Sequence, residues 1–369
     1  HRGVTQFRGN PAHTFYGAGT IPSTAPEIIW QFRTGQQFSK TLKTPWEGLG
    51  WTGQPAVSVE AHGTFVYIAS LDGHLYKLDF TTGEQVLRSE QNFNIIKSSP
   101  AVTDNYVVFG SWDNAVHIVD KHTFEVLHRE DAIYTPSASY DFDSSPTVEG
   151  DFFYIGGEDG YVRRISLVPP FTRSWIFPKK TPQSPFLYQN SNKPYVGIES
   201  SVAIAGDRAI VGSGRGQVFL LDKHNGALLA QFETGDDTDS SPVVDLADSS
   251  FYIGVEKDFV DKLGGLYKIS LSGDSLWFFE TGRKGIFSTP AIDSQRVIIT
   301  GDDRYLYSLD KTTGALHWKT RLRDGSWSSP ILIGGRILAA DYAGYLYGIE
   351  AEGGEMLWKI KLGNYIVCL

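Results

Sequence analysis

The sequence predicts an all-β fold made of consecutive four-stranded units, and three observations lead to this prediction. A string of short apolar runs and polar turns returns along nearly the whole chain of 369 residues. None of these runs is long enough for an ordinary helix or has a helical period. Their residues alternate and are often β-branched, and Gly- and Asp-bearing segments suited to tight turns separate them. A repeat of roughly 40 to 50 residues with four strands is typical of a β-propeller.

The clearest copy of the repeat spans residues 288–319. Its expected strands are a brief apolar run at 289–292, alternating runs at 296–300 and 305–309, and a closing run at 315–318. Such a unit exposes two apolar faces, so it needs a neighbour on each side. Aspartates end several third strands and are expected to accept backbone hydrogen bonds in the turn that follows; these are Asp79, Asp120, Asp222 and Asp310.

A Ser/Thr-Pro dipeptide marks the first strand of each copy. It occurs seven times, twice in degenerate form, at Gln54-Pro55, Ser99-Pro100, Ser145-Pro146, Ser201-Val202, Ser241-Pro242, Thr289-Pro290 and Ser329-Pro330. A fourth, outermost strand is expected both at 27–33, before any first strand, and at 356–360, so one outer strand is in excess. The sequence favours seven antiparallel blades in a ring closed by the N-terminal outer strand. It leaves open eight blades, with the eighth beginning at 365–369.

The repeats leave no gap for a linker, which predicts a single propeller domain over 1–369. Residues 1–29 are expected to be an irregular N-terminal segment packed on the ring. Acidic residues outnumber basic ones by 42 to 33, for a net charge of -9, and no Lys/Arg block stands out. A nucleic-acid partner is therefore not expected. The apolar runs are too short and interrupted for a transmembrane segment.

The repeat resembles that of a known family. A Ser-Ser-Pro string, followed by LDGHLYKLDFTTG at 71–83 and then a tryptophan, resembles the quinoprotein-type (PQQ-like) β-propeller repeat. The opening segment, with QFRGN at 6–10 and Trp30, is also similar to that family. Its enzymes are quinone-dependent dehydrogenases, generally longer, with a pair of adjacent cysteines, a calcium ion and catalytic carboxylates. The only cysteine here is Cys368, so we expect neither dehydrogenase activity nor bound pyrroloquinoline quinone (PQQ).

In size and plainness the chain resembles the non-enzymatic propeller lipoproteins of the bacterial outer-membrane barrel-assembly machinery. This resemblance implies a scaffold rather than an enzyme. It also implies an extracytoplasmic location, whether periplasmic, at the cell surface or secreted.

All four long connections of the repeat are of one class, which places them on the same face of a propeller. They run from an outer strand to the next inner strand, or from a second to a third strand, at 36–52, 132–142, 178–198 and 256–264. Function tends to lie on such loops. Their aromatic residues either pack on one another and cap the channel or form a platform for a protein or glycan; the candidates for this platform are Trp46, Trp51, Tyr140, Phe186, Tyr188 and Tyr195.

The residue three places before the second landmark residue is expected at the channel mouth on that face. Around the ring this position holds Thr52 and the six candidate ligand-binding residues: Lys97, Asp143, Glu199, Asp239, Phe287 and Trp327. The carboxylates Asp143, Glu199 and Asp239 are candidate metal ligands. Calcium suits an all-oxygen cluster, although it takes six to eight ligands. The alternative is a hydrated acidic mouth that Lys97 partly neutralises.

Two functions follow from these features. The preferred one is a non-catalytic scaffold that binds a protein or glycan on the loop-rich face and needs no cofactor, because no nucleophile-base-acid set is visible. The alternative is a cation-dependent ligand-binding protein, or a lyase- or hydrolase-type enzyme, with an acidic site at the channel mouth. Calcium is the cofactor that this second reading would involve, and no residue is named as catalytic.

Overall fold

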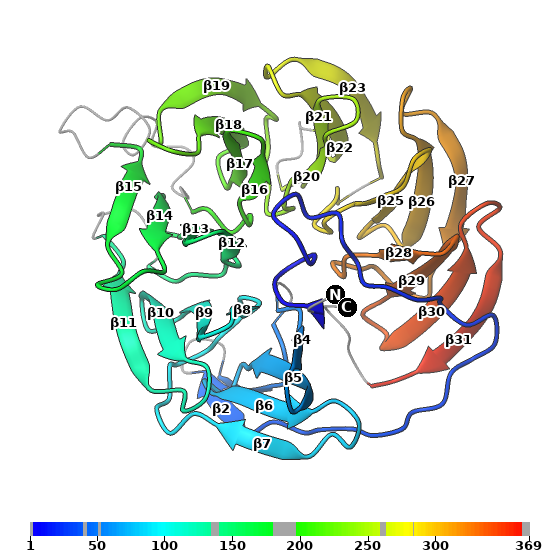
Figure 1. Cartoon of the computed structure of the whole chain (residues 1–369). Helices are drawn as coiled ribbons and strands as arrows, with labels where there is room; N and C mark the ends of the chain where they lie inside the picture. The colour runs from blue at the N-terminus through cyan, green and yellow to red at the C-terminus, as the bar shows by residue number, and fades with distance from the viewer. Residues whose placement is uncertain are drawn as a thin grey trace. The chain divides into compact units, whose positions relative to one another are not determined.

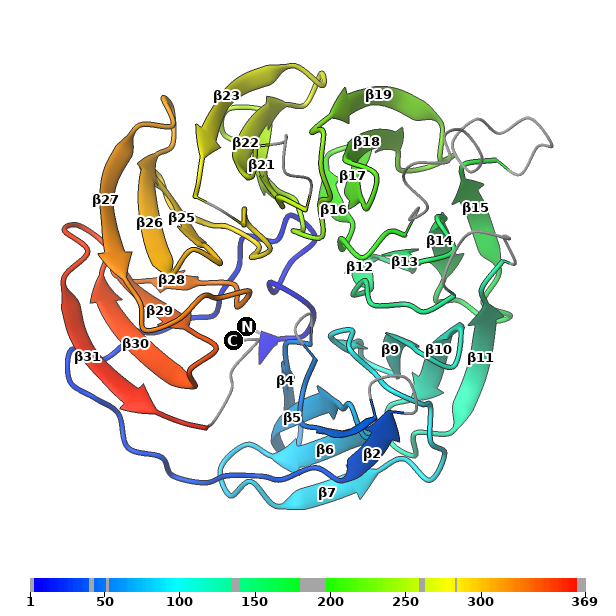
Figure 2. The same ribbon diagram turned by 180° about the vertical axis from the view of Figure 1, so that it is seen from behind.

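The structure is a computed structural model that describes residues 3–39, 43–50, 53–133, 140–179, 197–258, 263–282 and 284–363. Within these ranges every regular element is a β-strand. Seven antiparallel sheets each contain four strands consecutive in the chain, which confirms an all-β, seven-bladed propeller (Figures 1 and 2). Across the described part of the chain no helix could cross a membrane. The chain divides into two compact units, taken here one at a time.

Unit 1 contains His1–Asn10 and Ile28–Val202 and builds blades 1 to 3. Blade 1 has a fifth strand, β1, which pairs with β4, and a two-stranded hairpin of β2 and β3 precedes it. The strands are β1 (Gly3–Val4), β2 (Gln36–Ser39) and β3 (Thr44–Glu47); β4 (Ala56–Glu60), β5 (Gly63–Ala69), β6 (Leu75–Asp79) and β7 (Gln85–Arg88); β8 (Ala101–Val102), β9 (Tyr106–Ser111), β10 (Ala115–Asp120) and β11 (Val126–Asp131); and β12 (Thr147–Glu149), β13 (Phe152–Gly156), β14 (Val162–Ser166) and β15 (Arg173–Phe177).

Unit 2 contains Pro11–Glu27 and Ala203–Leu369 and builds blades 4 to 7. The strands are β16 (Ala203–Ala205), β17 (Arg208–Ser213), β18 (Gln217–Asp222) and β19 (Leu228–Glu233); β20 (Val243–Asp245), β21 (Ser250–Val255), β22 (Gly265–Ser270) and β23 (Ser275–Glu280); β24 (Ala291–Ile292), β25 (Arg296–Thr300), β26 (Tyr305–Asp310) and β27 (Leu316–Arg321); and β28 (Ile331–Ile333), β29 (Arg336–Ala340), β30 (Tyr345–Glu350) and β31 (Met356–Lys361).

The Ser-Ser-Pro landmark has a structural role that its hydroxyl groups explain. The first serine closes its own blade, because Ser98 Oγ accepts a hydrogen bond from the Gly110 N–H at 2.9 Å. The second connects neighbouring blades, since Ser99 Oγ accepts from the Gln54 N–H at 2.8 Å. The same inter-blade bond recurs within each unit, at Ser99 to Ser145, Ser145 to Ser201, Ser241 to Thr289 and Thr289 to Ser329. A buried N–H needs such a partner, so the repeat keeps a hydroxyl there.

The aspartates that end third strands accept hydrogen bonds from the backbone N–H groups two and three residues later. This confirms their predicted role at Asp79, Asp120, Asp222 and Asp310. Aspartates of the second-to-third turns have an additional role, because they accept from a tyrosine hydroxyl of the third strand. Such pairs are Asp72 with Tyr76, Asp303 with Tyr307 and Asp341 with Tyr347.

The core of each unit lies between successive blades. In unit 1, Phe93 packs edge-on against Phe109 with ring centroids 4.9 Å apart, and both side chains are fully buried. In unit 2, Ile298 and Ile337 belong to one buried cluster that joins blades 6 and 7. Burying an apolar side chain of this size contributes about 1.5–3 kcal/mol relative to leaving it exposed. The facing apolar surfaces therefore explain why one repeat needs another.

The expected outer strand at 27–33 does not form, so the prediction of a ring closed by an N-terminal outer strand is wrong. Each of the seven blades has its own fourth strand, and β31 is that of blade 7. Trp30 nevertheless resembles an outer-strand tryptophan, because its Nε1–H donates to the Phe80 carbonyl at 3.0 Å and its ring covers Gly83. Trp318 does the same to the next blade at Ala351 and Gly354. The tryptophan signal thus marked a packing contact rather than a strand.

The described part of the N-terminal segment is irregular apart from β1. Its second part is tied to unit 2 through hydrogen bonds to the inner and outer strands. The Tyr16 hydroxyl accepts from the Ile292 N–H at 2.9 Å, and the Trp358 Nε1–H donates to the Pro22 carbonyl at 2.8 Å. The eight-bladed alternative depended on residues 365–369, which lie outside the described residues, as does Cys368.

Candidate functional site

The first candidate site lies in unit 1 and gathers three carboxylates. Asp143 precedes β12, Glu199 precedes β16, and Glu158 lies in the turn between β13 and β14. One oxygen from each lies within 4.8 Å of the others. Of the predicted channel-mouth residues, the structure thus brings together Asp143, Glu199 and Lys97, while Asp239, Phe287 and Trp327 belong to unit 2.

Lys97 is part of this cluster. Its Nζ lies 2.5 Å from Asp143 Oδ2, and the Asp143 side chain is fully buried. Burial acts to lower the pKa of Lys97, but the charges of Asp143, Glu199 and the nearby Glu158 outweigh it and raise that pKa above its usual value. The ammonium therefore stays charged and offsets part of the negative charge of the carboxylates.

One tryptophan covers the lysine, and a second packs against the first. The Lys97 Nζ lies 4.3 Å from the ring centroid of Trp112, whose Nε1–H donates to Asp143 Oδ1 at 2.7 Å. Trp46, on β3, packs against Trp112 with centroids 5.6 Å apart. The predicted partner-binding residue Trp46 is therefore linked to the predicted ligand-binding residue Lys97 through Trp112. The hairpin of β2 and β3 is held to the connection between β7 and β8 by Gln37, whose Nε2–H donates to Asn94 Oδ1 at 2.6 Å.

A second carboxylate cluster lies in unit 2. Oxygens of Asp237, Glu256 and Asp258 lie within 4.8 Å of one another, and Glu256 is buried. Burial raises the pKa of Asp237 to about 6; its hydrogen bond with Asp239 opposes this, and the charges of Asp258 and Asp236 add to it. Burial also raises the pKa of Asp258. Asp239, named from the sequence, is thus a neighbour of this cluster through Asp237.

The sequence interpretation missed Trp112, Glu158 and Glu256, although one signal could have found them. All three directly follow the last residue of a second strand or its small neighbour, at Ser111, Gly157 and Val255. They open the turn into the third strand, on the same side of the blade as the connection before the first strand. Comparing this position among repeats would have placed them beside the predicted set.

The aromatic candidates of unit 2 lie together. Phe287 and Trp327 stack with centroids 4.7 Å apart, and Tyr342 meets Trp327 edge-on at 5.5 Å. Among the loop aromatics, Trp46 and Tyr140 are partly buried. The other four candidates, Trp51, Phe186, Tyr188 and Tyr195, lie outside the described residues, so their role stays a prediction.

Comparison with known proteins agrees with the repeat. Residues 23–168 and 263–365, more than half of the chain, match the family described as outer membrane protein assembly factor BamB. The chain belongs to this family. The resemblance to PQQ-like propellers and to the barrel-assembly lipoproteins is thereby confirmed. A search of curated proteins finds no match.

Solved structures of BamB and of quinoprotein enzymes share the fold. BamB from Moraxella catarrhalis is 14% identical with a TM-score of 0.65, covering 91% of this chain and 93% of that chain. Quinohemoprotein alcohol dehydrogenase ADHIIG from Pseudomonas putida HK5 is 12% identical with a TM-score of 0.73, covering 99% and 73%. A europium-containing methanol dehydrogenase is 12% identical with a TM-score of 0.70, covering 100% and 86%. Such identities show the fold alone.

The enzyme relatives raise the question of whether the Lys97 cluster fits a metal ion. It does not, because the Lys97 ammonium already lies against Asp143 and draws on the charge of Glu199. A divalent cation among these oxygens would lie beside the Lys97 charge, and the repulsion between the two cations opposes its binding. We therefore derive no metal or quinone chemistry at this site.

Proposed function

We propose that this BamB-family chain is a non-catalytic, extracytoplasmic scaffold that binds a protein partner through the loop-bearing side of its blades. The observation that carries the proposal is the Lys97–Asp143 ion pair at 2.5 Å. A lysine that compensates the carboxylates from within makes this cluster a structural support rather than a site for a charged cofactor. Membership of the BamB family supports the same reading.

The hairpin of β2 and β3 is the proposed contact surface of unit 1. Trp46 is anchored on Trp112, whereas Phe38, on the neighbouring strand, is 61% exposed. The register pairs Trp46 with Gln37 and Phe38 with Pro45, so the two rings point to opposite faces of the hairpin: Trp46 holds the hairpin on Trp112, and Phe38 faces away from that contact. Aromatic residues are enriched at interface hot spots. A glycan on this surface is the alternative partner.

Site-specific photo-crosslinking in the source cells tests the proposal. A photoreactive residue replaces Phe38, and the control replaces Val86, an equally apolar side chain on β7 that is 53% exposed. We expect a discrete protein adduct from position 38 that Trp46→Ala weakens, and none from position 86. No adduct, or the same adducts from both positions, would contradict the proposal. Dehydrogenase activity of the purified chain with added calcium and PQQ would contradict its non-catalytic part.

A second candidate function is cation-dependent ligand binding, and the cluster of Asp237, Glu256 and Asp258 favours it. One oxygen of each carboxylate lies within 4.8 Å of the other two, and the Glu256 side chain is buried. Calcium prefers such oxygen ligands. A cation at one hundred times its dissociation constant stabilises the folded state by about 2.7 kcal/mol. Thermal unfolding with calcium, magnesium or chelator measures this, and Glu256→Gln should abolish any shift.

A further inference from the structure

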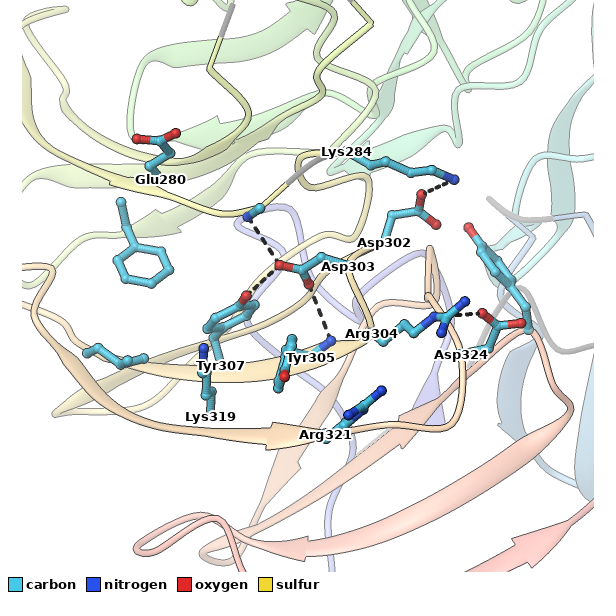
Figure 3. A pocket seen from close by; sticks show the side chains of 14 residues that line it. Glu280, Lys284, Asp302, Asp303, Arg304, Tyr305, Tyr307, Lys319, Arg321 and Asp324 are labelled. Carbon is cyan, nitrogen blue, oxygen red and sulfur yellow. Dashed lines mark hydrogen bonds and ion pairs between the residues drawn. The ribbon is translucent and has the colours of Figure 1, made fainter.

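A groove with a volume of about 830 Å³ lies in unit 2, between blades 5 and 6. The strands β23 and β27 form its walls, and the first residues of β26 form its floor (Figure 3). Pockets that hold ligands are usually of about 300–1,000 Å³. No candidate residue from the sequence lines this groove, and all of its lining residues belong to unit 2, whereas Phe38 and Trp46 belong to unit 1.

The groove contains as many acidic as basic side chains, but most of the carboxylates are engaged. Asp303 accepts from the Tyr307 hydroxyl at 2.5 Å and from the Gly282 N–H at 3.1 Å. Two ion pairs engage the others, Lys284 with Asp302 at 2.8 Å and Arg304 with Asp324 at 3.4 Å. Figure 3 shows these contacts as dashed lines. The charges that they involve are largely offset within the groove.

Two cations of β27 are not offset in this way. Lys319 and Arg321 are exposed, and within the described residues neither has a carboxylate partner. They lie two residues apart on one strand, so both side chains point to the same face of the sheet. Their Cα partners are Tyr307 and Tyr305, and the Lys319 Nζ lies 4.6 Å from the centroid of the Tyr305 ring. The pair therefore stands over an aromatic floor.

The aromatic floor offers apolar area beside these charges. Phe279, from β23, meets Tyr307 edge-on with centroids 5.5 Å apart, and Tyr305 lies 6.0 Å from Tyr307. Rings held in this way add contact area at a low entropic cost. A suitable ligand therefore presents negative charge to β27 and apolar groups to the floor.

We propose that this groove binds an acidic, extended peptide segment that runs alongside β27. Two cations separated by two strand residues are about 7 Å apart along the chain, which is the spacing of alternate side chains in another extended peptide. β27 is also the last strand of its sheet, so its outer edge has no partner strand among the described residues. The inference rests on the proposed protein-binding function and names the chemistry of one segment that a partner would contribute.

Glu280 is the carboxylate of the groove that is not engaged, so the charge argument can be tested by removing negative as well as positive charge. It is exposed on β23, the opposite wall, and forms no ion pair with another described residue, as Figure 3 shows for its labelled side chain. A carboxylate at this position repels an acidic ligand. Removing it should therefore strengthen binding, whereas removing Lys319 or Arg321 should weaken it.

The experiment measures fluorescence anisotropy of a short fluorescein-labelled peptide that alternates glutamate and phenylalanine. We expect binding to the whole chain that falls with rising salt. Lys319→Glu and Arg321→Glu should each weaken it about tenfold or more, and Glu280→Gln should tighten it severalfold. The circular dichroism spectrum checks that each variant is folded. If a charge reversal disturbs folding, Lys319→Gln and Arg321→Gln replace these variants and should also weaken binding.

The matched control is Lys359→Glu. Lys359 is an exposed lysine of β31 that lies 5.7 Å from the Tyr345 ring, so it copies the position of Lys319 one blade further on but outside the groove. This variant should bind the peptide like the unmodified chain. The proposal is overturned if the unmodified chain does not bind, if Lys359→Glu weakens binding as much as Lys319→Glu, or if a lysine-phenylalanine peptide binds equally well. Phe38 crosslinking is independent of these outcomes, so either proposal can fail alone.

Discussion

The Lys97 ammonium lies 2.5 Å from a carboxylate oxygen of the fully buried Asp143. It comes from the connection before β8, whereas Asp143 precedes β12, so the pair joins two consecutive blades. The Trp112 indole completes the arrangement by donating to the other oxygen of Asp143. The chain thus stabilises the carboxylates of unit 1 with its own cation.

Lys97→Met should destabilise the protein by about 3–5 kcal/mol, because it leaves the buried Asp143 charge without its counterion. Urea unfolding at neutral pH measures the loss. Calcium should partly restore the stability of this variant by binding to the carboxylates that Lys97 no longer compensates. It should not stabilise the unmodified chain through this cluster. Lys359→Met, which removes an exposed lysine, is the control and should cost little. A variant as stable as the unmodified chain would show that Lys97 is not the compensating charge.

Glu60 should make unit 1 sensitive to acid. Burial opposes its ionisation, but hydrogen bonds from Tyr67, Lys77 and Lys121 outweigh this and lower its pKa to about 2. Its contribution is therefore fully present above the unfolded pKa near 4.5 and is lost as pH falls towards 2, at most about 3 kcal/mol. Glu60→Gln should remove this part of the pH dependence in urea unfolding, while Glu84→Gln, at an exposed site, should not. An unchanged acid profile would contradict the prediction.

Asp237 should have the opposite effect on the pH dependence of stability from that of Glu60. Its folded pKa is raised to about 6, so the folded state binds an extra proton between the unfolded pKa and that value. Stability should then fall as pH rises from about 4 to 6. Asp237→Asn should raise the stability at pH 7 by roughly 1–3 kcal/mol and change it little at pH 4. Thermal unfolding at both values measures this; Glu355→Gln, at an exposed position, is the control, and equal gains at both values would contradict it.

Gly348→Ala should destabilise blade 7. A Cβ at this position of β30 would overlap the indole ring of Trp358, which β31 holds and which donates to the Pro22 carbonyl. Overpacking of this kind costs about 1–3 kcal/mol. Gly353→Ala is the matched control, since no heavy atom lies within 4 Å of its added Cβ. Thermal unfolding should separate the two variants, and equal midpoints would show that Trp358 can move aside.

The blades could be predicted from the sequence because their signals are local. Alternating strands, Asp-Gly turns and the Ser-Ser-Pro landmark each depend on neighbouring residues, and the landmark is tied to a repeated hydrogen bond from one blade to the next. The outer strand predicted at 27–33 was wrong because it, too, was inferred from a local signal, the tryptophan at position 30. Trp30 makes the contact of an outer-strand tryptophan with Gly83, but a side-chain contact does not require a strand.

The candidate sites were only partly predictable because they combine residues from different turns. Lys97, Asp143 and Glu199 share one repeat position and were found through it, whereas Glu158 and Glu256 occupy another position that was not compared. The groove over Tyr305 was missed altogether, since Lys319 and Arg321 look like ordinary exposed residues of an outer strand.

By itself, the sequence determined the four-stranded repeat and the class of connection that carries the long loops, because each follows from short-range periodicity and turn chemistry. It favoured seven blades over eight, and the structure decided for seven. Only the tertiary structure decided which charges are offset. Lys97 lies among carboxylates, Asp303 is engaged by Tyr307, and Lys319 and Arg321 keep their charge exposed. Charge compensation depends on distances of a few ångströms between residues remote in the chain, and no local pattern encodes them.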